Sequence, residues 1–131
     1  MRVTRGLKSF SMYRVEKDFD VFLIDLEVAG VELRNTNNRY SRYFRTLSRM
    51  AKEYGFPVEN LKHIDYVGRT TSERGKTTFI LRAYIDNGKV SYAAIASFKP
   101  RHLRELETAL IKSGWKRLFH VGIVMEHVKS A

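Results

Sequence analysis

Apolar residues recur with a helical period in two parts of the chain. In residues 38–54 they occupy every third or fourth position, which places them on one face of an α-helix. These positions are Tyr40, Tyr43, Phe44, Leu47, Met50, Ala51 and Tyr54. Gly55 and Pro57 then end the pattern. The same spacing predicts a second helix over residues 100–113, whose buried positions are Leu103, Leu106 and Leu110.

Other parts of the chain are rich in β-branched and aromatic residues, which favour strands. They are residues 20–26, 61–69, 77–85, 90–97 and 115–127, with a weaker candidate at 8–14. The sequence Asp86-Asn87-Gly88-Lys89 is typical of a tight hairpin turn. We expect two further hairpins, one between the two strands nearest the N-terminus and one at the polar residues 70–75.

The predicted order of elements is β-β-α-β-β-β-α-β. It indicates an α+β fold with a largely antiparallel sheet of five to six strands and two helices on one face. A ferredoxin-like layout and a duplicated ββαβ layout both fit this order. With 131 residues, the chain has the usual size of one domain. We therefore predict a single basic domain over residues 1–131, with residues 1–7 as a flexible arm.

One segment resembles a known motif. Residues 21–26 read Val-Phe-Leu-Ile-Asp-Leu, which resembles the first RNA-contacting strand of RNA recognition motif domains. The order of the elements that follow resembles that family too, whereas residues 77–85 lack its second motif, which holds basic and stacking aromatic residues. The resemblance implies a ferredoxin-like layout rather than membership of the family.

The composition excludes several classes of site and partner. The chain has no cysteine, which rules out disulfides, thiolate zinc sites and a cysteine nucleophile. Its longest apolar stretches are far too short to span a bilayer, and no secretory signal is recognisable, so we expect a cytoplasmic protein. Glutamine is absent as well, which is typical of thermophilic proteins.

The charge of the chain changes this picture most. The net charge is +10, and the charge is gathered in places. On the helix predicted at 38–54, the basic residues fall in an arc of about 140°, apart from the apolar arc. With the N-terminal arm and the hairpin tip at residues 70–75, this predicts contacts to the phosphates of DNA or RNA, without catalysis or cofactor. The predicted binding residues are Arg39, Arg42, Arg45, Arg49, Lys52, Arg69, Arg74, Lys76, Arg2 and Arg5.

Two other functions remain open from the sequence. Asp25 and Glu27 would share one face of the strand predicted at 20–26, and carboxylates on strands hold the magnesium of many nucleases. The basic surface could instead meet an acidic subunit, or sheet edges could form a homodimer. The four histidines show no spacing typical of metal ligands, so we predict no metal site and no catalytic residues.

Overall fold

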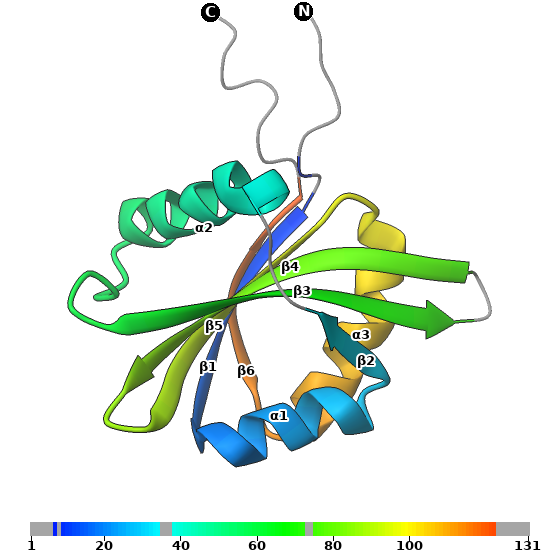
Figure 1. Ribbon diagram of the computed structural model, residues 1–131, viewed down its shortest axis with the longest axis horizontal. Coiled ribbons are helices and arrows are strands. Elements are labelled where there is room, and N and C mark those ends of the chain that lie inside the picture. Colours follow the sequence, from blue (N-terminus) through cyan, green and yellow to red (C-terminus); the bar gives the residue numbers. More distant parts are fainter. Residues whose placement is uncertain (1–6, 8, 35–37, 73–74, 123–131) are drawn as a thin grey trace, which may run out of the picture.

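The protein is an α+β fold built on one antiparallel sheet of six strands, with three α-helices (Figure 1). A computed structural model describes residues 7, 9–34, 38–72 and 75–122. The strand order across the sheet is β2-β3-β4-β5-β1-β6. The elements are β1 (Ser9–Asp18), α1 (Phe19–Val28), β2 (Val31–Arg34), the 3-10 helix η1 (Asn38–Tyr40), α2 (Ser41–Glu53), β3 (Lys62–Ser72), β4 (Gly75–Asp86), β5 (Lys89–Ser97), α3 (Pro100–Lys112) and β6 (Lys116–Val121).

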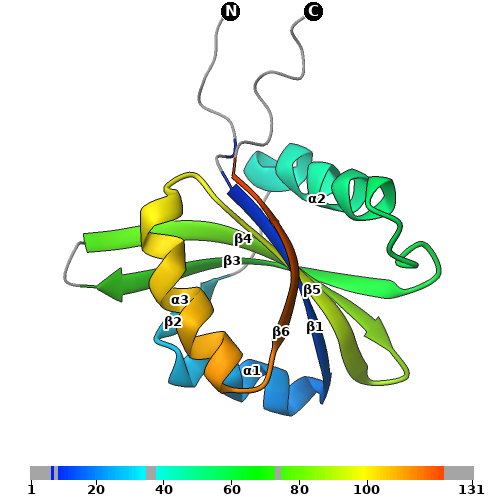
Figure 2. The same ribbon diagram turned by 180° about the vertical axis from the view of Figure 1, so that it is seen from behind.

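The sheet is covered on both faces, which corrects the prediction of helices on one face only. Successive residues of a strand point to opposite faces, and in β4 Phe79 and Leu81 join one buried cluster while Ile80 and Tyr84 join another. Helices α1 and α3 pack on the first cluster, and α2 packs on the second. Figures 1 and 2 show α2 on one side of the sheet and α3 on the other. Because β4 and β5 are buried on both faces, apolar residues follow one another along these strands with few interruptions.

The predicted strand at residues 20–26 is wrong, because this segment is helix α1. The buried positions of α1 are Phe22, Asp25 and Leu26, which follow the i, i+3, i+4 spacing of a helix. Its other apolar residues remain partly or largely exposed. The strand that precedes it is β1, which pairs with β5 and β6 and forms no hairpin with residues 20–26. The resemblance of residues 21–26 to an RNA-contacting strand therefore fails.

The short strand β2 was not predicted, whereas most of the other elements agree with the sequence pattern. Helices α2 and α3, strands β3, β4 and β5, and the N-terminal strand β1 lie where they were predicted. Asn87 and Gly88 form the β4–β5 turn with φ of 57° and 83°, a backbone conformation that favours asparagine and glycine. Gly55 ends α2 with φ of 86°, where the Phe56 amide donates to the Ala51 carbonyl. The last predicted strand is β6, and residues 123–127 lie outside the described part.

The order of elements along the chain is β-α-β-α-β-β-β-α-β. Two consecutive ββαβ units would need two strands before the first helix, so the duplicated layout is wrong. The order of the six strands does not show a ferredoxin-like layout either. Within the described residues, no helix is long and apolar enough to cross a membrane.

Candidate nucleic-acid interface

Helix α2 divides its side chains between the sheet and the solvent. Phe44, Leu47, Met50 and Ala51 are buried against the sheet. The helical period turns the positions between them outward. All the basic residues predicted for this helix are exposed, one on η1 and four on α2: Arg39, Arg42, Arg45, Arg49 and Lys52. The basic residues face the solvent because the apolar face of the helix packs in the core.

Two cations at the C-terminal end of α2 have carboxylate neighbours. The Arg49 Nε lies 3.8 Å from a carboxylate oxygen of Glu53, and the Lys52 Nζ lies 2.8 Å from a carboxylate oxygen of Glu59. The hydrogen bond that Lys52 donates to Glu59 raises the pKa of Lys52. All four side chains are more than half exposed, so solvent screens both pairs and the attraction within each is weak. A phosphate can therefore compete for these cations at small cost.

Arginine and tyrosine alternate at the N-terminal end of the helix. The Arg39 guanidinium lies 5.5 Å from the centre of the Tyr40 ring, and the Arg42 guanidinium lies 5.4 Å from that of Tyr43. Tyr43 in turn packs edge-on against Phe98. Such cation–π contacts hold a guanidinium beside a ring while leaving its N–H groups able to donate to an anion.

Arg82 of β4 anchors α2 to the sheet. Its guanidinium donates two hydrogen bonds to Asp65 of β3, at 2.6 and 2.7 Å, and a third to the Ser48 hydroxyl of α2. It also lies 5.8 Å from the centre of the Phe44 ring. The Ser48 and Tyr84 hydroxyls are hydrogen-bonded at 3.2 Å. Since Arg82 is only 7% exposed, this network fixes where the basic helix sits.

The same network affects two titrating groups. Burial raises the pKa of the Tyr84 hydroxyl. Burial, and then the charge of Arg82, lower the pKa of His63, although Asp65 opposes this. His63 therefore favours its neutral form more than an ordinary histidine does, which makes it a weak candidate for phosphate binding.

Of the predicted residues outside the helix, only Arg69 has a described side chain. It lies on β3 two residues after Val67, so both side chains point to the sheet face that α2 covers. Its cross-strand partner on β2 is Glu32. The structure thus places Arg69 on the same face as the basic helix, toward the β3–β4 turn. Arg2, Arg5 and Arg74, and the side chain of Lys76, lie outside the described residues.

The carboxylates considered for a nuclease do not share a face. In a helix, residues two apart point in nearly opposite directions, and Asp25 is buried while Glu27 is exposed. One Asp25 oxygen accepts hydrogen bonds from Lys17 Nζ at 2.7 Å and from the Trp115 indole at 2.8 Å. Lys17 also donates to the Ser113 carbonyl. Asp25 therefore joins α1 to β1 and to the start of β6.

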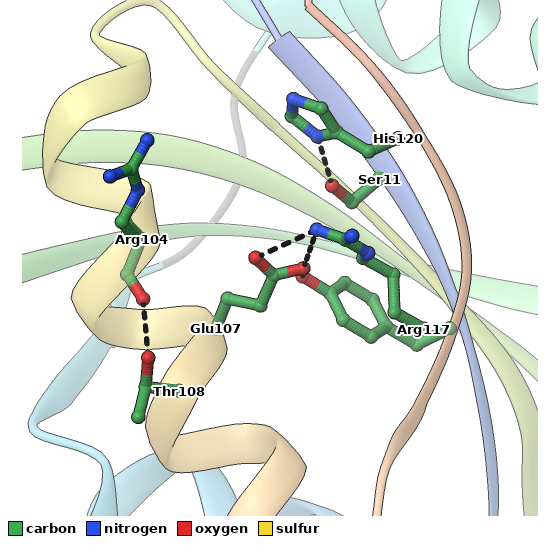
Figure 3. A network of polar contacts seen from close by, with 7 residues as sticks. Ser11, Arg104, Glu107, Thr108, Arg117 and His120 are labelled. Atoms are coloured by element: carbon green, nitrogen blue, oxygen red, sulfur yellow. Dashed lines mark hydrogen bonds and ion pairs between the residues drawn. The ribbon is translucent and has the colours of Figure 1, made fainter.

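A second polar group joins α3 to the sheet (Figure 3). Glu107 accepts a hydrogen bond from the Tyr13 hydroxyl at 3.1 Å and two from Arg117, at 2.9 and 3.1 Å. Burial, and then the charge of Glu107, raise the pKa of Tyr13 well above its usual value. Close by, the Ser11 hydroxyl and His120 are hydrogen-bonded at 2.8 Å. Glu107 is neutralised by Arg117, so this group is a structural link on the side away from α2.

Sequence reasoning missed several residues around the C-terminal end of α2. Tyr54 was assigned to the buried face of the helix, yet it is 51% exposed and stacks on Phe119. Arg14 and Lys116 are cross-strand partners on β1 and β6, and both are exposed. The alternation of β1 places Arg14 on the same face as Met12, below α2. Alternation could have identified Arg14, but the pairing with Lys116 requires the sheet order.

Comparisons of the chain with protein-family models, with curated proteins and with solved structures find no match. Among the side chains that the structure describes, no three histidine, aspartate or glutamate residues gather closely enough to hold a metal ion.

Proposed function

We propose that the protein binds nucleic acid without catalysis and that its phosphate contacts come from the outward surface of α2. The observation that carries this proposal is the division of the helix. Its apolar side packs in the core, whereas its solvent-facing side carries Arg42, Arg45, Arg49 and Lys52. A solvent-facing helix surface that served only solubility would mix both signs to gain i, i+4 pairs, whereas α2 carries one acidic residue, Glu53, at its end, paired with Arg49.

The dimensions of the helix support the proposal. From Arg42 to Lys52, α2 extends about 15 Å at the usual rise per residue. One strand of B-DNA rises about 3.4 Å along the duplex axis per nucleotide, so a helix of this length lying parallel to that axis covers the rise of about four nucleotides. Arginine is also suited to the task, because its planar guanidinium donates two parallel hydrogen bonds to one phosphate.

The distribution of acidic residues supports the same side of the molecule. Asp18, Asp20 and Glu27 are exposed at or on α1, which packs on the opposite face of the sheet from α2. A polyanion approaching the molecule is repelled by these carboxylates and attracted by α2. The field therefore favours one orientation of binding.

The test is the salt dependence of binding for two matched double variants. Arg42→Ala/Arg45→Ala removes two charges from α2, and Arg104→Ala/Lys112→Ala removes two exposed charges from α3. Because each phosphate contact contributes about 0.7–0.9 to the slope of log affinity against log salt, the α2 variant should lower the slope by about 1.4–1.8. The α3 variant should leave it unchanged. Equal effects would indicate a generally basic surface, and a protein that binds no nucleic acid at low salt would refute the proposal.

The alternative functions give different results with the same preparations. A nuclease would cleave plasmid DNA with magnesium or manganese, and Asp25→Asn would stop it. A protein that assembles with itself would form a stable oligomer in light scattering, whether or not nucleic acid is present.

We keep the ferredoxin-like layout as a proposal about the inner part of the fold. The strands β6-β1-β5-β4 are neighbours that alternate in direction, and the helices α1 and α3 pack on one face of them. In this interpretation, β2, α2 and β3 are an insertion between α1 and β4. An experimental structure in which these four strands and two helices do not superpose on such a layout would overturn it.

A further inference from the structure

An aromatic ring is exposed at the C-terminal end of the basic helix. Tyr54 follows the last residue of α2, and among the phenylalanine, tyrosine and tryptophan side chains that the structure describes it is the most exposed. One face of its ring stacks on Phe119 of β6, with centroids 4.2 Å apart and planes inclined by 16°. Half of the Tyr54 side chain remains in contact with water, at 51% exposure. Aromatic rings pair in offset-stacked or edge-on arrangements, so the exposed part of this ring is available to a second stacking partner.

The ring rests on a rigid support. Phe119 packs against Phe10 and Phe56, with centroids 5.4 Å apart in both cases. Phe56 packs edge-on against Tyr92 of β5 at 5.7 Å. Phe10 is fully buried in the sheet, so the whole group is joined to the core. A stacking surface held in this way loses little conformational freedom when a ligand binds.

Cations occur on helix α2 and on two strands near this ring. Arg49 and Lys52 precede Tyr54 in the last turns of α2. Arg14 and Lys116 are cross-strand partners on β1 and β6, on the same face of the sheet as Phe119. Arg14 is two residues along β1 from the cross-strand partner of Phe119, which corresponds to about 7 Å. An Arg14 guanidinium nitrogen also lies 3.5 Å from a carboxylate oxygen of Glu16, and both side chains are at least half exposed.

We infer that this surface binds single-stranded nucleic acid, with a base stacked on the outer face of Tyr54. The backbone would run from the α2 surface to Arg14 and Lys116. A duplex keeps its bases stacked on one another, whereas a single strand can turn a base out onto an aromatic ring. The inference rests on the proposed function and adds to it the class of nucleic acid.

The experiment compares three proteins on one oligonucleotide in single-stranded and duplex form, as DNA and as RNA. Wild type is compared with Tyr54→Leu, which removes the ring, and with Tyr54→Phe, which keeps it. Stacking on one aromatic residue corresponds to about a 5- to 150-fold change in affinity. We expect Tyr54→Leu to lose single-strand affinity by that factor and to keep its duplex affinity, while Tyr54→Phe binds like wild type. Unchanged unfolding midpoints would show that both variants are folded.

Two results would overturn the inference. If Tyr54→Leu binds single strands as well as wild type does, the ring has no role in binding. If it weakens single-strand and duplex binding equally, the ring does not distinguish them. In both cases the proposed function stands, provided that Arg42→Ala/Arg45→Ala still lowers the salt slope. A wild-type protein that binds neither form would instead refute the proposed function, and the inference with it.

Discussion

At the scale of single residues, the role of a carboxylate is set by neighbours that are remote in sequence. Asp25 and Glu27 are two positions apart, yet only Asp25 is buried and paired. Its partners Lys17 and Trp115 are 8 and 90 positions away. Nothing in the local sequence distinguishes a structural aspartate of this kind from a metal ligand, which is why both interpretations were open before the structure was known.

Replacement of Asp25 should therefore change stability rather than binding. Asp25→Asn leaves Lys17 without its counter-ion, and removal of one partner from such a partly buried pair should cost about 2 kcal/mol. The control Asp20→Asn changes an exposed carboxylate of the same helix and should stay within about 0.5 kcal/mol of wild type. Urea unfolding followed by the fluorescence of buried Trp115 measures both. An Asp25→Asn variant as stable as wild type would contradict the structural role.

At the scale of elements, the sequence predicts α2 well and α1 badly. In α2 the apolar residues are numerous and regular, and most of the charged positions between them are basic. In α1 one of the three buried positions is Asp25, so the apolar residues alone do not show a helical period. The many β-branched and aromatic residues of this segment favour a strand. Tertiary contacts with the sheet override this local preference. The placement of helices on both faces depends on sheet order, which no periodicity reveals.

The position of α2 should depend on the pair formed by Arg82 and Asp65. Asp65→Ala leaves a buried guanidinium without its carboxylate and should cost about 3 kcal/mol in urea unfolding. The double variant Asp65→Leu/Arg82→Met removes both charges, so it should recover most of that loss. A double variant as unstable as Asp65→Ala would show that the packing around the pair, rather than its charge balance, secures the helix.

At the scale of the whole molecule, helices α1 and α2 lie on opposite sides of the sheet and differ in charge. The basic helix α2 covers one side, and the acidic helix α1 lies on the other (Figures 1 and 2). The sequence alone identified the basic residues of α2, because a helix surface can be read from spacing. It did not identify the exposed ring of Tyr54 stacked on Phe119, because Phe119 and the pair Arg14 and Lys116 come together only through the order β5-β1-β6.

The central claim is that nucleic acid binds to the α2 side of the sheet. The most direct test is to titrate isotope-labelled protein with a single-stranded oligonucleotide and to follow the backbone amide signals by NMR. We predict that the largest shifts occur in α2 and around Tyr54, and that α1 and α3 change little. Shifts concentrated in α1 or α3, with α2 unaffected, would contradict the account.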